Sequence, residues 1–357
     1  MRKPIGMGLL AAVVLAVGLP AVAQRYKITD LGTIQGSTYN WATGVNNLGH
    51  VVGCAGCSDL NTPAFFWTPQ NGMQALPSLP SGGATYAYAI NDSDQVAGLS
   101  YGLGESSDAS LAVIWSSTNS IQSLGTLPGG TQSSAFAINN LGQVTGTSSV
   151  DSGLANHAFL WTSSTGMLDL QPAGLGSSWG FGVNSLGHVT GMFIGSNAHA
   201  NPRAFYWTGQ TGMQDLAVLP GWDTSAGEGI NNLDEIAGSL QGFDGKSISH
   251  AVLWTPSGGG GWGVKDLGTL PGGFQSFATA LNNVGQVVGA SDTGQNESLD
   301  HAFVWSTATG MQDLNLLIPA GSGWLLWQAN GINDLGQITG KGTINQETHA
   351  FLLTPMQ

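Results

Sequence analysis

Hydrophobic and polar residues alternate along this chain in short runs bounded by glycine, asparagine and proline. Alternation over four to eight residues is typical of half-buried β-strands, and no window keeps the 3.6-residue period of a helix. Four such runs recur in a fixed order: one like Ala89-Ile90-Asn91, one like Gln143-Val144-Thr145-Gly146, a His-Ala-Phe-x-Trp segment and a Met-x-Asp-Leu segment. The pattern predicts an all-β protein.

The four-strand unit occurs seven times, with 45 to 51 residues between the asparagines that end its first strand. Repeats of this period indicate solenoids or propellers, and four short strands per unit are typical of a propeller blade. A glycine follows each asparagine by seven residues, which indicates a shared backbone demand, either a close approach or a positive φ. The seven repeat anchors are Asn46, Asn91, Asn139, Asn184, Asn231, Asn282 and Asn333.

Alanine or glycine also stands four and two residues before every anchor, as at Ala42 and Gly44. One face of the first strand is therefore bare in every copy, while the other face carries larger side chains. This asymmetry predicts that the first strand is the innermost one, crowded around a central axis.

The two ends of the chain are complementary. After a leader, Lys27 to Ile34 has the pattern of a fourth strand with nothing before it, and His349 to Gln357 that of a third strand with no fourth after it. Pairing the N-terminal strand into the C-terminal blade would remove exposed sheet edges. We therefore expect a seven-bladed β-propeller of four-stranded antiparallel blades, closed by that pairing.

The first 23 residues have the pattern of a secretory signal peptide. Arg2 and Lys3 precede an apolar run from Gly8 to Leu19, and Ala21-Val22-Ala23 matches the small-residue cleavage pattern. No later segment is apolar for long enough to span a bilayer. We expect residues 24–357 to form a single propeller domain, a monomer that is secreted or periplasmic and is not inserted in the membrane after cleavage.

Charge and motifs exclude several functions. The chain has a formal net charge of −13, and without Arg2 and Lys3 it has six basic against 21 acidic residues, or −15. Nucleic acid is excluded as a partner because phosphate contacts need clustered Lys and Arg. No zinc or phosphate-binding motif is present, so we expect no metal and no cofactor. The acidic loop from Asp292 to Asp300 does not have EF-hand spacing, and calcium dependence stays open.

The two cysteines, Cys54 and Cys57, follow Gly53 in one loop. In an exported chain such a pair predicts a small loop disulfide. Redox catalysis is disfavoured because a reactive Cys-x-x-Cys needs a helix N-terminus to lower the thiol pKa, and no helix is expected here.

Three residue types recur at fixed places in the repeat, and we interpret all three as structural. Tryptophans of the third strand are expected in the core. Histidines of the same strand are spread one to a blade, which is wrong for a metal cluster, and aspartates of the fourth strand are expected to tie turns. The histidines are His157, His250, His301 and His349, and the aspartates are Asp30, Asp169, Asp215, Asp266 and Asp313.

Aromatic residues outside these recurring repeat positions are concentrated just before and at the start of the first strand. Trp41, Tyr86 and Trp179 share one repeat offset and are expected to pack between blades. Exposed aromatics around a channel mouth suit stacking on sugar rings or gripping a peptide. The candidates for ligand binding are Trp222, Trp324, Trp327 and Phe274.

One pair of acidic residues suggests an alternative. Glu228 is the only acidic residue inside an innermost strand, and Asp223 precedes it in the loop. Two carboxyl groups at a propeller mouth could act as general acid and base in a glycosidase or lyase. This alternative requires that the two carboxyls converge on one sugar linkage.

The segments Ile138 to Val144, His301 to Trp305 and Asp266 to Gly273 closely resemble the HAF repeat family, the probable extracellular repeats of bacterial exported proteins. The resemblance extends over essentially the whole mature chain and implies a bacterial, extracytoplasmic protein. It implies no enzymatic activity, since none is assigned to the family.

Three functions follow from the sequence. We favour an exported binding or interaction module for a polysaccharide or an envelope protein, with no catalysis assigned. The alternatives are a glycan-degrading enzyme and a passive structural or matrix protein. The passive role predicts no pocket on either face, which makes it distinguishable by geometry.

Overall fold

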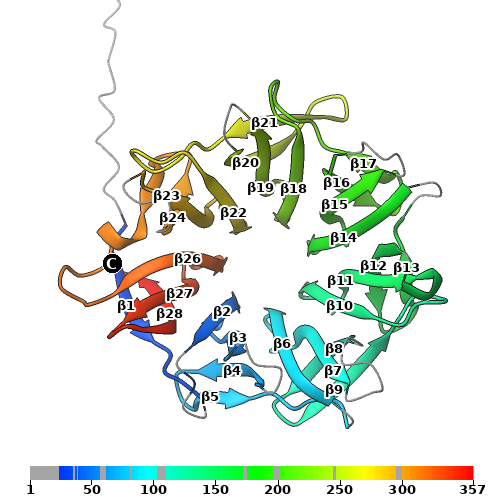
Figure 1. Ribbon diagram of the computed structural model, residues 1–357, viewed down its shortest axis with the longest axis horizontal. Helices are drawn as coiled ribbons and strands as arrows, with labels where there is room; N and C mark the ends of the chain where they lie inside the picture. The colour runs from blue at the N-terminus through cyan, green and yellow to red at the C-terminus, as the bar shows by residue number, and fades with distance from the viewer. Residues whose placement is uncertain are drawn as a thin grey trace, which may run out of the picture.

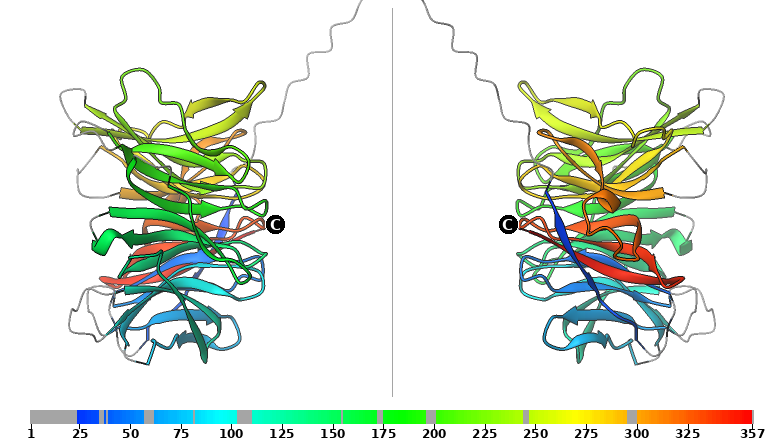
Figure 2. Two further views of the ribbon diagram at one scale, coloured as in Figure 1. Left: turned by 90° about the vertical axis from the view of Figure 1, so that its right-hand side faces the viewer. Right: turned by 90° about the vertical axis from the view of Figure 1, so that its left-hand side faces the viewer.

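The computed structural model describes residues 24–34, 37, 39–56, 62–80, 82–102, 110–153, 155–171, 175–195, 201–243, 247–294 and 300–356. Seven four-stranded antiparallel sheets stand around a central axis (Figure 1), and the molecule is a disc with one sheet after another along its circumference (Figure 2). The predicted seven-bladed β-propeller is confirmed. None of the described residues forms a helix with the length and apolarity needed to cross a membrane.

The first three blades are built from consecutive strands. Blade 1 holds β2 (Asn40–Val45), β3 (Val51–Ala55), β4 (Ala64–Thr68) and β5 (Gly72–Ala75). Blade 2 holds β6 (Gly82–Ile90), β7 (Val96–Gly102), β8 (Ser110–Ser117) and β9 (Ser120–Gly125). Blade 3 holds β10 (Ser133–Ile138), β11 (Val144–Val150), β12 (Ala155–Thr162) and β13 (Gly166–Asp169), with the 3-10 helix η1 (Asp151–Gly153) between β11 and β12.

The remaining blades follow the same plan. Blade 4 holds β14 (Leu175–Val183), β15 (Val189–Gly195), β16 (Arg203–Thr208) and β17 (Gly212–Asp215). Blade 5 holds β18 (Thr224–Ile230), β19 (Ile236–Phe243), β20 (Ser247–Ser257) and β21 (Gly261–Asp266). Blade 6 holds β22 (Ser276–Leu281), β23 (Val287–Asp292), β24 (Asp300–Ser306) and β25 (Gly310–Asp313), followed by the 3-10 helix η2 (Leu314–Leu316).

The seventh blade joins the two ends of the described chain. It holds β26 (Leu325–Ile332), β27 (Ile338–Ile344) and β28 (Glu347–Pro355), and its outermost strand is β1 (Tyr26–Asp30). Strand β1 pairs antiparallel with β28 in a register that runs from Tyr26 opposite Pro355 to Asp30 opposite Phe351. In Figure 1 the blue β1 lies against the red β28. The ring is therefore closed as the sequence predicts.

The core lies between neighbouring blades. The third-strand tryptophans are at most 9% exposed, and Leu353, which takes their place in the last blade, is fully buried. These residues are Trp67, Trp115, Trp161, Trp207, Trp254 and Trp305. Their prediction as core residues is confirmed, because each belongs to an apolar cluster within or between blades.

Every innermost strand carries a β-bulge at the third residue before the anchor. In β10, for example, Ala135 faces Gly146 and Ala137 faces Thr145, so that Phe136 has no partner across the ladder. The same register shift occurs in β2, β6, β14, β18, β22 and β26. A bulge leaves its extra residue unpaired and re-aims its side chain.

The recurring glycine is explained by this bulge. A Cβ built on Gly146 would collide with the carbonyl oxygen of Ser134 on the neighbouring strand, and Gly53 and Gly238 meet the same obstacle. Of the two causes that the sequence left open, a close approach is therefore correct, and positive φ is not. The small residues before the anchor are equally constrained, since a Cβ on Gly44 would lie 3.3 Å from Ala89 of the next blade.

Candidate functional site

The seven anchoring asparagines form a closed ring of hydrogen bonds at one end of the central channel. The side-chain Nδ2 of each anchor donates to the main-chain carbonyl oxygen of the next anchor, over 2.7 to 3.2 Å. The last of these bonds runs from Asn333 back to Asn46. Within its own blade each anchor fixes the hairpin turn, as Asn139 does by accepting from the main-chain N–H groups of Leu141 and Gln143. The anchors are thus inter-blade links, a role that the sequence did not reveal.

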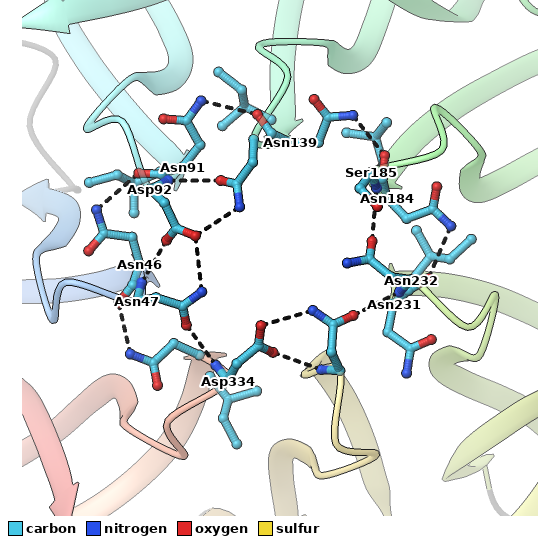
Figure 3. Close-up of a pocket in the computed structure, with 18 of the residues that line it drawn as sticks. Asn46, Asn47, Asn91, Asp92, Asn139, Asn184, Ser185, Asn231, Asn232 and Asp334 are labelled. Carbon is cyan, nitrogen blue, oxygen red and sulfur yellow. Dashed lines mark hydrogen bonds between the residues drawn. The ribbon is translucent and has the colours of Figure 1, made fainter.

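A second ring lies next to the first and lines the channel mouth. The residue after each anchor accepts a hydrogen bond from the main-chain N–H of its counterpart in the preceding blade, as Asp92 does from Asn47 at 2.8 Å and Asn47 from Asp334 at 2.9 Å. Six of the seven links are present among the described residues, and the missing one falls between Asn140 and the shorter Ser185. Figure 3 shows the side chains around the opening. The linked residues are Asn47, Asp92, Asn140, Ser185, Asn232, Asn283 and Asp334.

The mouth encloses a cavity of about 220 Å³ lined by these two rings and by the aliphatic residues that precede the anchors. Its amides and carboxylates are largely bonded to one another: Asp92, for instance, accepts from the side chains of both Asn47 and Asn140. Polar groups that already satisfy each other gain little from a ligand. We therefore interpret the mouth as a structural element that holds neighbouring blades together.

Six of the seven hairpin turns around this mouth carry an exposed aliphatic side chain at their tip. This residue is the second one after the anchor. Their exposed fractions run from 57% to 71%, and Ser93 takes the place in blade 2. Each stands on a different blade and is preceded and followed by polar residues or glycine of its own turn. The six are Leu48, Leu141, Leu186, Leu233, Val284 and Leu335.

A second cavity, which we call the chamber, occupies the channel on the side where the innermost strands begin. Its volume is about 310 Å³. The aliphatic residues before the anchors stand between the two cavities along every innermost strand, so no residue lines both. All seven bulge residues line the chamber, and Trp41 and Gln328 complete it. The bulge residues are Thr43, Tyr88, Phe136, Phe181, Glu228, Thr279 and Asn330.

The chamber wall has two unlike halves. Three consecutive blades contribute an aromatic arc of Tyr88, Phe136 and Phe181, whose neighbouring ring centroids are 5.3 and 5.7 Å apart. The bulge residues of the other four blades are polar, and Glu228 stands directly after the aromatic arc. The sequence hides this arrangement because each of the seven blades supplies only one bulge residue.

Among the described residues that line the chamber, only Glu228 carries a carboxyl group. Burial raises the pKa of Glu228 to about 7. Within the described part of the chain no hydrogen bond or ion pair to its carboxylate is found. Its charged form is therefore poorly compensated near neutral pH. Burial likewise raises the pKa of Tyr88 to about 12, so that its phenol stays neutral.

The hydroxyl groups opposite the aromatic arc are oriented by the neighbouring main chain. Thr43 Oγ1 donates to the carbonyl oxygen of Ala87 at 2.9 Å, and Thr279 Oγ1 donates to that of Ala329 at 2.6 Å. Asn330 Nδ2 donates to the carbonyl oxygen of Ala42 at 2.8 Å. Because the hydroxyl hydrogens are used in this way, the two threonine oxygens can serve a ligand only as acceptors.

Trp41 forms part of the chamber wall, and it also contacts Lys341 of the neighbouring blade 7, in line with the expected packing between blades. The Nζ of Lys341 lies 4.5 Å from the centroid of the Trp41 ring. Burial lowers the pKa of Lys341, and the nearby charge of Asp300 partly opposes that effect. An ammonium group on an aromatic face is a favourable cation–π contact.

None of the four aromatic residues selected from the sequence lines the mouth or the chamber. Trp222 is partly buried and its ring lies 5.0 Å from that of His250, and Trp324 packs 6.2 Å from Phe351. Trp327 is partly buried, and its Nε1 has no hydrogen-bond partner among the described residues. Phe274 is 63% exposed.

Asp223 and Glu228 do not converge. Asp223 is exposed just before β18, and Glu228 is the bulge residue near the end of the same strand. Five residues of extended chain place them roughly 16 Å apart, whereas the carboxyl pairs of glycosidases stand about 5 to 9.5 Å apart. The geometry required for the acid–base pair is not met.

The histidines that recur in the third strand pair with the aspartates that recur in the fourth strand. His157 Nδ1 lies 2.8 Å from Asp169, His301 Nδ1 2.7 Å from Asp313, and His250 and His349 make equivalent pairs. The aspartates also accept from turn N–H groups, as Asp30 does from Gly32 at 2.9 Å. The histidines and aspartates at these two repeat positions are therefore structural, as expected. Considering each repeat position by itself does not reveal that the two are paired.

Two predicted features fall wholly or partly outside the described residues. Cys54 is buried in β3 and is disulfide-bonded, whereas Cys57 lies outside the described residues, so the Cys54 to Cys57 pairing stays a prediction. Most of the acidic loop between Asp292 and Asp300 lies outside them as well, as does the leader of residues 1–23.

No protein-family model matches the chain, and a search of curated proteins found no match. Among solved structures, the chain is similar to a putative TolB from Agrobacterium tumefaciens, with 13% identity and a TM-score of 0.43 over 72% of this chain and 86% of that one. It is also similar to a protein of unknown function from Dyadobacter fermentans, with 9% identity and a TM-score of 0.42 over 92% of this chain and 99% of that one.

Proposed function

We propose that this protein is an exported binding module that holds a small ligand in the chamber. The observation that carries the proposal is the chamber itself, a 310 Å³ cavity with an aromatic half and a polar half. Small-molecule sites are concave and mostly apolar, with a few convergent polar groups that fix orientation. The chamber has this composition, and the mouth, whose polar groups satisfy one another, does not.

The bulges argue further that the chamber is built for a ligand. Seven bulge side chains are directed to one place, and they include half-buried Tyr88, Phe136 and Phe181 beside Glu228. A passive matrix protein has no need of such a cavity and was expected to have no pocket on either face. A binding role accounts for both the cavity and its mixed wall.

The same proposal includes that the protein is exported and that its repeats are of the HAF type. The leader of residues 1–23 and the HAF-like segments support a bacterial protein that acts outside the cytoplasm, in the periplasm or beyond the cell. A soluble sugar, a polysaccharide end or a small envelope metabolite would be encountered there. Two acidic residues that are far apart give no support to glycan cleavage.

The test is a thermal-shift screen of residues 24–357 against saccharides, amino acids and small organic cations. A ligand that binds only the folded state raises the melting temperature by mass action. Each hit is then measured on Phe136→Ala, which removes the middle of the aromatic arc, and on Phe274→Ser, which removes an exposed aromatic outside the chamber. We expect Phe136→Ala to weaken binding by about tenfold or more and Phe274→Ser to leave it unchanged.

The reverse result would contradict the proposal. Binding that is lost in Phe274→Ser and kept in Phe136→Ala would place the ligand on the surface aromatics instead. A complete screen with no chamber-dependent hit would remove the binding role of the chamber.

A further inference from the structure

We propose that the ligand of the chamber is a small organic ammonium cation, held between the aromatic arc and the carboxylate of Glu228. This inference rests on the proposed binding function and names the chemistry of its ligand. Three independent features of the wall favour a cation over a neutral molecule or an anion.

The first feature is the aromatic arc. The rings of Tyr88 and Phe136 meet at 74° and those of Phe136 and Phe181 at 56°, so the three rings are tilted against one another along a curved wall. Aromatic faces carry negative quadrupole potential and attract ammonium groups, most strongly where water is excluded. Because the rings are tilted against one another, a ligand in the chamber can meet such faces from more than one direction.

The second feature is the orientation of the two threonine hydroxyls on the polar side. Thr43 and Thr279 give their hydroxyl hydrogens to main-chain carbonyls and keep only oxygen lone pairs for the cavity. Asn330 likewise spends a side-chain N–H on Ala42. The oxygen lone pairs that the two threonines keep for the cavity favour a ligand that carries positive charge over one that carries negative charge.

The third feature is the isolated carboxylate. Glu228 has no cationic partner within the described residues, and burial alone disfavours its ionised form. The ammonium group of Lys341 lies on the ring of Trp41, and the charge of Asp300 acts on Lys341. An ammonium ligand would supply the missing counter-charge to Glu228.

The contact between Lys341 and Trp41 serves as an internal precedent. An ammonium nitrogen already lies 4.5 Å from the centroid of a chamber-lining ring. Cavities of about 300 Å³ are at the small end of the range for ligand sites. The chamber therefore fits a small molecule better than a folded partner.

The experiment compares choline with its uncharged isostere 3,3-dimethyl-1-butanol, in which carbon replaces the quaternary nitrogen. Isothermal titration is done on residues 24–357 at pH 8 and low salt. We expect saturable binding of choline and at least about tenfold weaker binding of the alcohol, because only choline gains the charge-dependent contacts. Glu228→Gln should weaken choline binding by about tenfold and leave the alcohol unaffected. Asp223→Asn is the control, since this exposed carboxylate of the same blade is outside the chamber, and we expect no change.

A pH series adds a second readout. Lowering the pH from 8 to 5.5 protonates Glu228 and should weaken choline binding to the level of Glu228→Gln, whose own affinity should hardly change. Tyr88, the other titratable group in the chamber wall, stays neutral throughout this range.

The outcomes separate the two proposals. Equal binding of choline and its isostere, or choline binding that Glu228→Gln does not alter, would overturn the ammonium assignment. A saccharide that binds and is lost in Phe136→Ala, with no binding of choline, would overturn it while leaving the chamber as a binding site. Choline binding that survives Phe136→Ala unchanged would contradict both.

Discussion

At the scale of single residues, Glu228 shows how position decides chemistry. At the bulge position the other six blades carry uncharged side chains. Glu235, a second glutamate of blade 5, accepts a hydrogen bond from Asn231 Nδ2 at 2.7 Å. Glu228 instead stands at a bulge, directed into the chamber beside Phe181. A carboxyl group in such surroundings binds its proton more tightly than in water, and folding then depends on pH.

We expect Glu228→Gln to stabilise the unliganded protein at pH 8 and to have little effect at pH 4.5. The folded pKa of about 7 exceeds the ordinary value of 4.5, so the unfolded chain loses this proton first as the pH rises, and stability falls between these two values. The loss amounts to roughly 3 kcal/mol at most. Glutamine cannot ionise and avoids it. Urea denaturation at both pH values measures the effect.

Asp223→Asn provides the matched control for this prediction, because Asp223 is an exposed acid of the same blade. Its effect should be small and similar at both pH values. An equal stability of Glu228→Gln and the natural chain at pH 8 would mean that the carboxylate is well solvated.

At the scale of strands and turns, the anchors join all seven pairs of neighbouring blades. Each anchor holds its own hairpin turn through Oδ1 and reaches the next blade through Nδ2. The two functions belong to different atoms of one amide. A change from amide to carboxylate therefore separates them.

Asn282→Asp should cost about 2 to 4 kcal/mol of unfolding free energy. The carboxylate can still accept from the turn, but it can no longer donate to the carbonyl oxygen of Asn333 or to Gln286 Oε1, and it brings a buried negative charge against both oxygens. Asn232→Asp is the matched control. Its Oδ1 accepts from the main-chain N–H of Ser185, and a carboxylate preserves that bond at the more exposed mouth.

Chemical denaturation compares the two variants, and a cost within about 0.5 kcal/mol is expected for Asn232→Asp. Equal losses in both would show that the inter-blade donor has no special role.

At the scale of the whole molecule, the sequence predicts what repeats and misses what varies. Blade number, strand order and the tryptophan core are periodic, so several copies report the same feature, and ring closure follows from the complementary strands at the two ends. The bulge residues differ in type between most blades. They could have been found only by comparing the position between the two small residues of each repeat. Loop aromatics such as Trp222 are conspicuous in the sequence, yet their environment depends on packing against His250, which no spacing reveals.

Deleting residues 24–31 should lower the melting temperature far more than trimming an ordinary terminus, by well over 10 °C. The deletion removes the outermost strand of blade 7, including the fully buried Tyr26, and leaves β28 as an open sheet edge. Lys27→Ala is the control, since its exposed side chain can be removed while the strand is kept. Calorimetry measures both, and an unchanged melting temperature for the deletion would defeat the role of the closure.

The anchor ring also sets a scale for the channel. Each link involves only two neighbouring blades, and the same amide meets the same carbonyl seven times, including the step from Asn333 to Asn46. The geometry of one anchor-to-anchor hydrogen bond does not depend on the number of blades in the ring. Duplication or loss of one repeat would leave the chemistry of every junction intact while widening or narrowing the chamber and adding or removing one side chain from its wall. Copy number and a single variable position per copy are thus two independent ways in which evolution can change what such a ring encloses.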